Sequence, residues 1–334
     1  MSPQQSFVGL DEIERARTAI AATVRATPVN LSQSLSDLAG VAVHLKLEHT
    51  QVTGSFKLRG AANAVSTLTG EEKSRGVVGV STGNHGRGLA YAARAAGVRC
   101  IICMSRLVPQ AKIDGIRAQG AEVRIIGASQ DEAQQEVVRL VSQDGMTMIP
   151  PFDHRAIIAG QGTLGLELLE QMPDVATVLV PLSGGGLISG VAAALKARRP
   201  EISTIGISME RGAAMHDCLK AGKPIHVEEL ATLADSLGGG IGLDNQLTFA
   251  MTRDLVDDVI LVSETEIAAA IRHLYWQERQ IVEGSGSVGV AALLAGRIKS
   301  AGPVAAILSG GNIDMTQHFR IISGEDVDVT KEAA

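Results

Sequence analysis

A lysine near the start of the chain lies in a setting that suits covalent chemistry. Lys57 stands between Phe56 and Leu58, in the segment Gly54-Ser-Phe-Lys-Leu-Arg-Gly-Ala61, which is rich in small residues. Partial burial would lower the pKa of the amine, and a lysine needs a lowered pKa to attack a carbonyl and form a Schiff base. Taken alone, however, the segment favours an ordinary lysine at the start of a helix, with its charged end in the solvent.

Two further segments suit the binding of anions at the start of a helix. Val80-Ser-Thr-Gly-Asn-His-Gly86 closes an apolar strand, and its hydroxyls and backbone N–H groups would favour a carboxylate. Ser, Thr and Asn are also the usual N-cap residues, so the same atoms would serve both roles. Val180-Pro-Leu-Ser-Gly-Gly-Gly-Leu187 lets the backbone approach a phosphate closely. It is neither a Walker loop nor a clear dinucleotide fingerprint.

A fourth glycine-rich segment is Leu308-Ser-Gly-Gly-Asn312, directly after a predicted strand. Ser309 would offer a hydroxyl to a buried heteroatom there. Considered alone, this segment is a weak signal.

Apolar runs rich in Val and Ile alternate with helical patterns, and they predict the elements that position these segments. Apolar strands separated by helices indicate an α/β fold with a mainly parallel sheet covered on both faces. The predicted strands are 42–47, 77–81, 99–104, 122–126, 175–181, 204–208, 258–262 and 303–308. The predicted helices include 86–96, 111–118, 131–141, 162–170, 187–197 and 264–277.

The order of these elements predicts two lobes with a ligand site in the cleft between them. Residues 77–148 form three strand–helix units, which predicts a small domain. Residues 1–76 and 149–334 would then form one discontinuous large domain that binds the ligand.

Composition excludes several classes of protein. The 334 residues are 45% hydrophobic, with a net charge of −6 and scattered basic residues, so no nucleic-acid surface is expected. No apolar run reaches the length of a membrane span, and the N-terminus is polar, which predicts a cytoplasmic protein. Cys100 and Cys103 lie three apart on a predicted strand, so their sulfurs should point to opposite faces as buried structural thiols.

The four segments occur in a highly specific order. A Ser-Phe-Lys-x-Arg-Gly-Ala segment, then Ser-x-Gly-Asn-His, Ser-Gly-Gly-Gly and Ser-Gly-Gly-Asn, resembles the threonine dehydratase and serine racemase family. The resemblance runs from about residue 20 to 314. It implies a two-lobed fold-type II fold with pyridoxal 5'-phosphate (PLP) in the cleft. The segments Asn84-His-Gly-Arg-Gly-Leu89 and Ser208-Met-Glu-Arg-Gly-Ala-Ala-Met215 are similar to the dehydratase of hydroxyectoine utilisation.

The resemblance implies a role for each motif residue. Lys57 would hold PLP as a Schiff base and then remove the α-proton of the substrate. Phe56 would pack against the cofactor ring, and Asn84 would hydrogen-bond its phenolic oxygen. Ser309 would face the pyridine nitrogen; a hydroxyl keeps that nitrogen less protonated than a carboxylate would, which suits β-elimination or racemisation better than transamination. The phosphate would be held by the backbone of Gly184, Gly185, Gly186 and Leu187.

Substrate contacts follow from the same resemblance. The substrate carboxylate would be held by Ser81, Thr82, Asn84 and His85. Glycines of the segment Ser236-Leu-Gly-Gly-Gly240, Gly239 among them, would leave room beside the substrate side chain. Thr82 also stands where a racemase has its second acid–base serine, and its extra methyl favours a dehydratase.

The chain departs from the family at a cation site beside the cofactor. Many relatives have a glutamate and an aspartate where this chain has Ser208 and Ala214, so no metal is expected. Glu210 and Asp217 would restore such a site only if the loop were realigned.

The sequence therefore predicts a PLP-dependent dehydratase, or ammonia-lyase, for a β-hydroxy amino acid, as a homodimer. A hydroxyectoine-derived or hydroxyaspartate-like substrate fits the glycines. A serine-type amino-acid racemase is one alternative, and a non-catalytic sensor of PLP or an amino acid is another.

Overall fold

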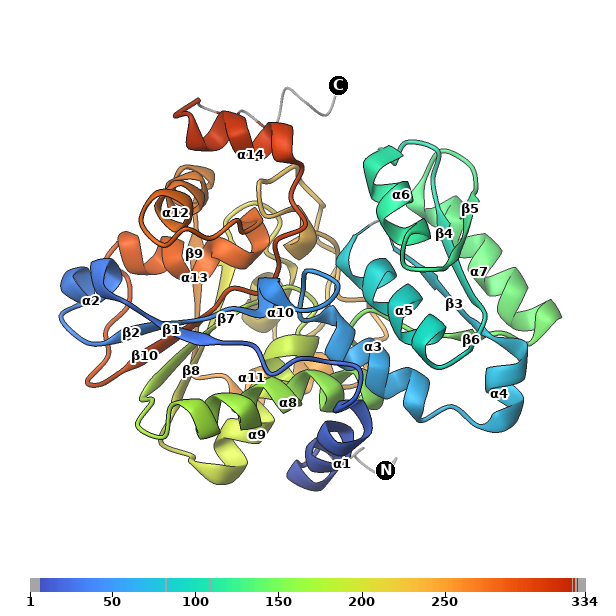
Figure 1. Ribbon diagram of the computed structural model, residues 1–334, viewed down its shortest axis with the longest axis horizontal. Coiled ribbons are helices and arrows are strands. Elements are labelled where there is room, and N and C mark those ends of the chain that lie inside the picture. Colours follow the sequence, from blue (N-terminus) through green and yellow to red (C-terminus); the bar gives the residue numbers. More distant parts are fainter. Residues whose placement is uncertain (1–6, 82, 109, 326, 328, 330–334) are drawn as a thin grey trace.

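The computed structural model describes residues 7–81, 83–108, 110–325, 327 and 329, with strands in two sheets (Figure 1). The larger sheet has the order β1-β2-β10-β7-β8-β9, and β1 is antiparallel to β2 while the other pairs are parallel. Its strands are β1 (Val29–Ser32), β2 (Val43–Lys46), β10 (Val304–Ile307), β7 (Thr177–Pro181), β8 (Ser203–Met209) and β9 (Asp258–Val262). The predicted mainly parallel α/β fold is confirmed.

The smaller sheet is entirely parallel and has the order β5-β4-β3-β6. Its strands are β5 (Glu122–Ile125), β4 (Cys100–Met104), β3 (Val77–Val80) and β6 (Thr147–Met148). All of them lie within residues 77–148, yet α3 from outside this range packs against α5 in the same core cluster. The division of the chain into a small and a large domain stays a prediction.

Helices connect the strands in both sheets. They are α1 (Leu10–Ile20), α2 (Gln33–Ala39), α3 (Lys57–Ser66), α4 (Gly70–Arg75), α5 (Asn84–Ala95), α6 (Gln110–Arg117), α7 (Gln130–Asp144), α8 (Arg155–Gln171), α9 (Gly186–Arg198), α10 (Ala214–Ala221), α11 (Thr248–Leu255), α12 (Glu264–Trp276), α13 (Gly284–Leu294) and α14 (Met315–Ile322). Short 3₁₀ turns are η1 (Glu48–Thr50) and η2 (Asp235–Leu237). In the described residues no helix is long and apolar enough to cross a membrane.

Both faces of each sheet are covered, which explains why the strands read as continuous apolar runs. In β7, Leu179 packs with residues of α12 and α13, whereas Val178 and Val180 pack with residues of α8 and α9. In β4, Cys100 packs with α3 and α5, whereas Cys103 packs with α7. The prediction that these two buried thiols point to opposite faces is confirmed.

Helix α8 begins at Arg155, seven residues before the predicted start at residue 162. Its first half contains Gly160 and Gly162, whose low helix propensity hid the helix from sequence analysis. A Cβ at residue 160 would lie 2.5 Å from the carbonyl oxygen of Arg59, so the glycine allows α8 to lie directly on α3. The strands β1 and β6 were also not predicted, because they are short and only partly apolar.

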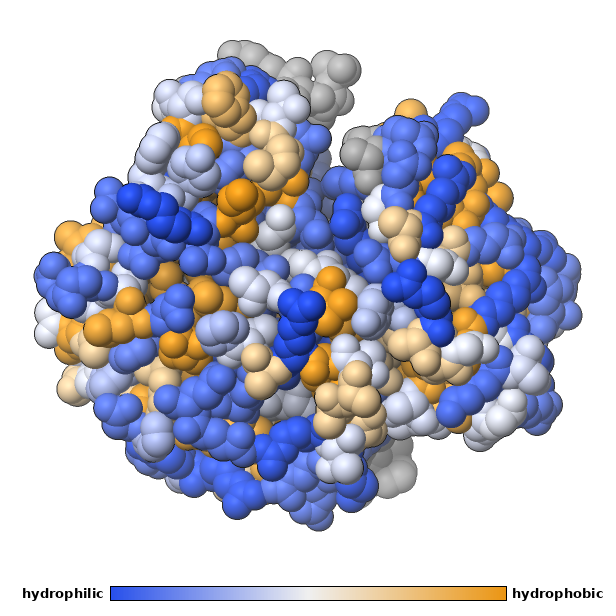
Figure 2. All heavy atoms as spheres, in the orientation of Figure 1, coloured by the Kyte–Doolittle hydropathy of each residue, from blue (hydrophilic) through white to orange (hydrophobic). Residues whose placement is uncertain are grey.

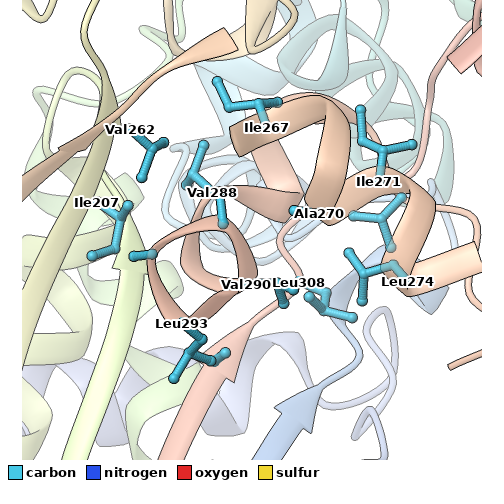
Figure 3. Packing of buried hydrophobic residues seen from close by; sticks show 14 of the residues in the cluster. Ile207, Val262, Ile267, Ala270, Ile271, Leu274, Val288, Val290, Leu293 and Leu308 are labelled. Atoms are coloured by element: carbon cyan, nitrogen blue, oxygen red, sulfur yellow. The ribbon is translucent and has the colours of Figure 1, made fainter. Parts of the chain in front are cut away.

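The molecule is hollowed between the surface over α14 and the surface over α6 (Figure 2). Below the α14 side of this hollow, α13 is buried all round between α12 and the larger sheet (Figure 3). Val288 of α13 lies toward Ile207 and Val262, and Val290 lies beside Leu308, in this cluster. Close packing on every side leaves α13 little freedom to move, and its first residues lie at the candidate site.

Candidate active site

A cavity lies where the loops after β7 and β10 meet the first turns of α3, α5, α9 and α13. The carboxyl ends of neighbouring parallel strands share one edge of a sheet, which is where ligands bind in α/β folds. The cavity is lined by Phe56, Lys57, Asn84, Phe152, Pro181, Ser183, Gly184, Gly185, Gly186, Leu187, Ser236, Leu237, Glu283, Ser285 and Ser309. It therefore brings together residues from all four predicted segments.

Lys57 is the first residue of α3, and its Nζ donates a hydrogen bond to the carbonyl oxygen of Pro151 at 2.9 Å. Burial lowers the pKa of this amine from 10.5 to about 8, although the charge of Glu283 acts in the opposite direction. The Nζ lies 5.3 Å from the centre of the Phe56 ring. About a tenth of the amine is then neutral at pH 7, far more than for an exposed lysine, which makes Lys57 a competent nucleophile and base.

A buried ion-pair network fixes the start of α3. Arg59, 1% exposed, donates to Glu48 at 2.8 Å through Nε and to Glu167 at 2.8 Å through Nη2. Burial alone would raise the pKa of Glu48, but Arg59 holds that pKa below its usual value. Lys46 completes the network through an ion pair with Glu167 at 2.5 Å. Because Arg59 lies two residues after Lys57, the network holds the backbone that carries the reactive amine.

The start of α5 combines a helix cap with the predicted carboxylate site. The Oγ of Ser81 accepts hydrogen bonds from the backbone N–H groups of Gly83 at 3.3 Å and Gly86 at 2.9 Å. The predicted site residue Thr82 lies outside the described residues. The hydroxyl of Ser81 is therefore engaged in capping, and it does not belong to the cavity lining described above.

His85 is turned away from the cavity. Its Nε2 donates to the carbonyl oxygen of Ile149 at 2.9 Å, and the side chain is not part of the cavity lining in the described residues. Burial, together with the charge of Lys57, lowers the pKa of the imidazole to about 4. The imidazole is therefore neutral at pH 7 and offers no positive charge to a carboxylate.

Sequence analysis missed a carboxylate in the cavity. Glu283 accepts a hydrogen bond from Nδ2 of Asn84 at 2.6 Å and another from the backbone N–H of Asn312 at 3.1 Å. The Nδ2 of Asn312 donates to Oδ1 of Asn84 at 2.6 Å, which closes the triad. Burial, together with the charge of Asp235, raises the pKa of Glu283 to about 7. The available signal was a lone acidic residue between Ile281-Val282 and the Gly-Ser-Gly-Ser start of an apolar helix.

The glycine loop lies against the ring of Phe152, a second residue that the sequence did not indicate. A Cβ at residue 184 would lie 2.5 Å from the Phe152 ring, and a Cβ at residue 186 would lie 2.9 Å from its backbone. Gly185 has a φ of +86° and is the N-cap of α9, whose first turn includes the buried Leu187. The N–H groups at this helix start are placed to bind an anion.

Two serines line the cavity. Ser309, 3% exposed, follows β10, and its carbonyl oxygen accepts the N–H of Phe56 at 3.0 Å, so β10 is tied to the start of α3. Ser285 lies in the first turn of α13, and its buried Oγ has no hydrogen-bond partner among the described residues. An unsatisfied buried hydroxyl suits a cavity that takes a polar ligand.

Two other predicted positions lie apart from this cavity. Gly239, with a φ of +92°, follows Ser236 and Leu237, which do line the cavity, but it is not itself in the lining. At Ser208, where many relatives have a cation ligand, the Oγ is buried against Met209. Within the described part of the chain, no group of three or more His, Cys, Asp or Glu residues is arranged to hold a metal ion.

Comparison with known proteins assigns the chain to a family. Residues 20–310 match the family described as pyridoxal-phosphate dependent enzyme. The chain is 59% identical to a protein of Sinorhizobium fredii that is provisionally named a threonine dehydratase, over 96% of each chain. It is 41% identical to the L-threonine ammonia-lyase of Thermotoga maritima, over 95% of this chain and 79% of that one.

The solved structures agree with this match. The structure of maize serine racemase superposes with a TM-score of 0.90 at 36% identity, over 95% of this chain and 98% of that one. The predicted fold-type II architecture and the predicted cofactor are thereby confirmed. The chain belongs to the threonine dehydratase and serine racemase family of pyridoxal-phosphate-dependent enzymes.

Proposed function

We propose that this protein is a PLP-dependent ammonia-lyase that removes water from a β-hydroxy amino acid. The observation that carries the proposal is the buried amine of Lys57, whose pKa is lowered to about 8, in one cavity with the glycine loop and Ser309. Relatives at 59% and 41% identity named as a threonine dehydratase and an L-threonine ammonia-lyase support the same reaction.

The residues of the cavity fit PLP. The glycine loop at the start of α9 has no side chains to obstruct a phosphate, and the unpartnered hydroxyl of Ser285 would gain a partner. One N–H of the Asn84 amide remains after its bond to Glu283, and it would be free to donate to the phenolic oxygen. We therefore propose the following cofactor-binding residues: Phe56, Lys57, Asn84, Gly184, Gly185, Gly186, Leu187 and Ser309.

When bound, PLP supplies an electron-withdrawing ring that stabilises negative charge at the α-carbon of the substrate. The amine of Lys57 accepts the α-proton, because its lowered pKa leaves a neutral fraction near pH 7. The N–H groups at the start of α5 hold the substrate carboxylate, and the cap formed by Ser81 keeps those groups in place. Thr82 and the backbone of His85 belong to the same proposed carboxylate site.

The hydroxyl of Ser309 and the β-hydroxyl of the substrate together favour an elimination reaction. A hydroxyl beside the pyridine nitrogen favours elimination over transamination, since it does not hold a proton there as a carboxylate would. Loss of the α-proton and the β-hydroxyl releases one water. The imine that follows takes up one water and releases ammonia, so the net products are a 2-keto acid and ammonia.

We propose that the substrate is larger than threonine. A hydroxyectoine-derived or hydroxyaspartate-like amino acid is larger than threonine, and the segment after Ser236 and Leu237 at the cavity, which contains Gly239, offers glycines rather than bulky side chains. Racemisation is the second candidate, and the similarity to maize serine racemase favours it. We also propose that the protein is a homodimer and that it is located in the cytoplasm.

The test combines a spectrum with product analysis. The purified protein should be yellow, and it should form keto acid and ammonia from at least one β-hydroxy amino acid in a panel. Lys57→Ala should abolish both properties, whereas Lys299→Ala, at an exposed lysine, should retain them. A yellow protein that only inverts the α-carbon, detected by chiral analysis, would make it a racemase. A protein that cannot be loaded with PLP would refute the proposal.

A further inference from the structure

A second cleft of about 430 Å³ opens beside the cavity that contains Lys57. Glu283 lines both spaces, so the cleft adjoins the candidate active site. Helices α5 and α6 form one side of it, and α14 with the start of α13 forms the other, below the hollow seen in Figure 2. Six of its twelve lining residues are charged, which suits a substrate with a second charged group better than one that ends in the methyl group of threonine.

Most charged groups in this cleft already have a partner. Lys112 pairs with Asp235 at 3.2 Å, and Arg320 pairs with Glu325 at 2.6 Å. Asp314 caps α14 by accepting two backbone N–H groups, and Glu283 accepts from Asn84 and Asn312. Among the charged lining residues in the described part of the chain, Arg87 alone forms no hydrogen bond or ion pair.

Arg87 is held in place by packing. Its side chain lies against Gly115 of α6, where a Cβ would come within 2.5 Å of the guanidinium Cζ. A glycine inside a helix costs about 1 kcal/mol relative to alanine, and here it makes the room in which the guanidinium lies. Arg87 is half-buried, and burial lowers the pKa of its guanidinium while the charge of Glu283 opposes that change. Arginine nevertheless stays charged in proteins, so a half-buried cation without a partner remains.

Arg87 lies on α5 close to a residue that lines the cavity with Lys57. Asn84 and Arg87 are three residues apart and therefore lie on the same face of the helix. Asn84 lines the cavity with Lys57, and the backbone of Gly88 packs on the backbone of Lys57, where a Cβ would lie 3.1 Å away. Arg87 is thus about one helical turn, roughly 5 Å, beyond the residue that lines the cavity.

We propose that Arg87 is a specificity-determining residue that binds a second carboxylate on the substrate. The substrate class is then an acidic β-hydroxy amino acid such as 3-hydroxyaspartate. A planar guanidinium binds a carboxylate through two parallel hydrogen bonds, and half-burial strengthens them. The inference rests on the proposed ammonia-lyase function and goes beyond it, because it names the residue that selects the substrate.

The first experiment compares substrates. We expect kcat/KM for at least one stereoisomer of 3-hydroxyaspartate to exceed that for threonine. The ratio of the two values should fall about 10- to 100-fold in Arg87→Gln, the loss expected for a charge-assisted hydrogen bond. Arg87→Lys should lie between these two proteins, because it keeps the charge and loses the paired geometry. Arg94→Gln is the matched control, since it removes the same charge from an exposed position on the same helix.

The second experiment needs no turnover. Succinate and butyrate each have four carbons but differ by one carboxylate, and calorimetry would measure their binding to the PLP-loaded protein. Succinate should bind at least about tenfold more tightly, and Arg87→Gln should abolish the difference. This comparison decides the inference even if no amino acid yields a keto acid, an outcome that would refute only the proposed ammonia-lyase function.

Three results would overturn the inference. An equal fall of the substrate ratio in Arg94→Gln would show that the loss of any cation on α5 lowers it, which removes the case for Arg87. If kcat/KM fell equally for threonine and 3-hydroxyaspartate in Arg87→Gln, Arg87 would bind the α-carboxylate that both substrates share, and not a second carboxylate. Equal binding of succinate and butyrate by the unaltered protein would mean that the cleft does not recognise a second carboxylate, whichever variants fold.

Discussion

Replacing Lys57 by methionine should stabilise the cofactor-free protein at neutral pH. Burial lowers the pKa of the Lys57 amine from 10.5 to about 8, so the folded state holds the charged amine less favourably than the unfolded state does. A tenfold change in proton affinity corresponds to about 1.4 kcal/mol, which makes this penalty about 3 kcal/mol. Methionine has a similar length, but it loses the hydrogen bond to Pro151, worth about 1 kcal/mol. The expected net gain is about 2 kcal/mol in the free energy of unfolding.

The gain should depend on pH in a defined direction. Below pH 8 the amine is protonated in both states, so the folded protein bears the whole penalty. Between pH 8 and 10.5 the folded state has lost the proton while the unfolded state still binds it, and the stability of the unaltered protein therefore rises with pH. The advantage of Lys57→Met should shrink over this range and disappear as pH approaches 10.5.

Urea unfolding of the cofactor-free proteins at a series of pH values is the assay, followed by the fluorescence of Trp276, the single tryptophan. Lys299→Met, at an exposed position, should change the free energy of unfolding by less than about 0.5 kcal/mol at any pH. The reasoning is refuted if Lys57→Met is less stable than the unaltered protein at pH 7. It is also refuted if the gain stays constant from pH 7 to pH 10, since the cause would then not be the buried charge.

Two further changes test the glycine loop and the missed carboxylate. Gly184→Ala should weaken PLP binding at least about tenfold, because the new Cβ would meet the ring of Phe152. Spectrophotometric titration measures the Kd, and an unchanged Kd would contradict the role of the loop. Gly70→Ala is the control, because a Cβ at residue 70 meets nothing within 4 Å. Glu283→Gln should gain stability relative to the unaltered protein, by up to about 3 kcal/mol, as pH rises from 4.5 to 7. Burial raises the pKa of Glu283 to about 7, so the unaltered protein must take up a proton on folding in that range. Urea unfolding measures this difference, and an equal difference in the free energy of unfolding between the two proteins at pH 5 and at pH 7.5 would rule this out.

Much of the fold could be predicted because strands and helices leave local patterns. Of the ten strands in the described residues, eight were predicted to within about two residues, since strands covered on both faces are continuous apolar runs. The two that were missed, β1 and β6, are a partly exposed edge strand and a strand of two residues. The early start of α8 was missed because Gly160 weakens the helical pattern. This glycine lets α8 contact the backbone of Arg59, and that contact between two helices appears only in the tertiary structure.

The sequence by itself determined the motifs, their order and the reactive lysine, because each glycine-rich turn is a local feature that follows its own strand. Only the tertiary structure decided what surrounds them. Glu283 lies 199 residues from Asn84 and yet accepts its hydrogen bond, and His85 faces Ile149 rather than the cavity. The same holds for charge: burial by distant segments lowers the pKa of both Lys57 and Arg87. Burial and pairing depend on contacts between residues far apart in the chain, and no local pattern contains that information.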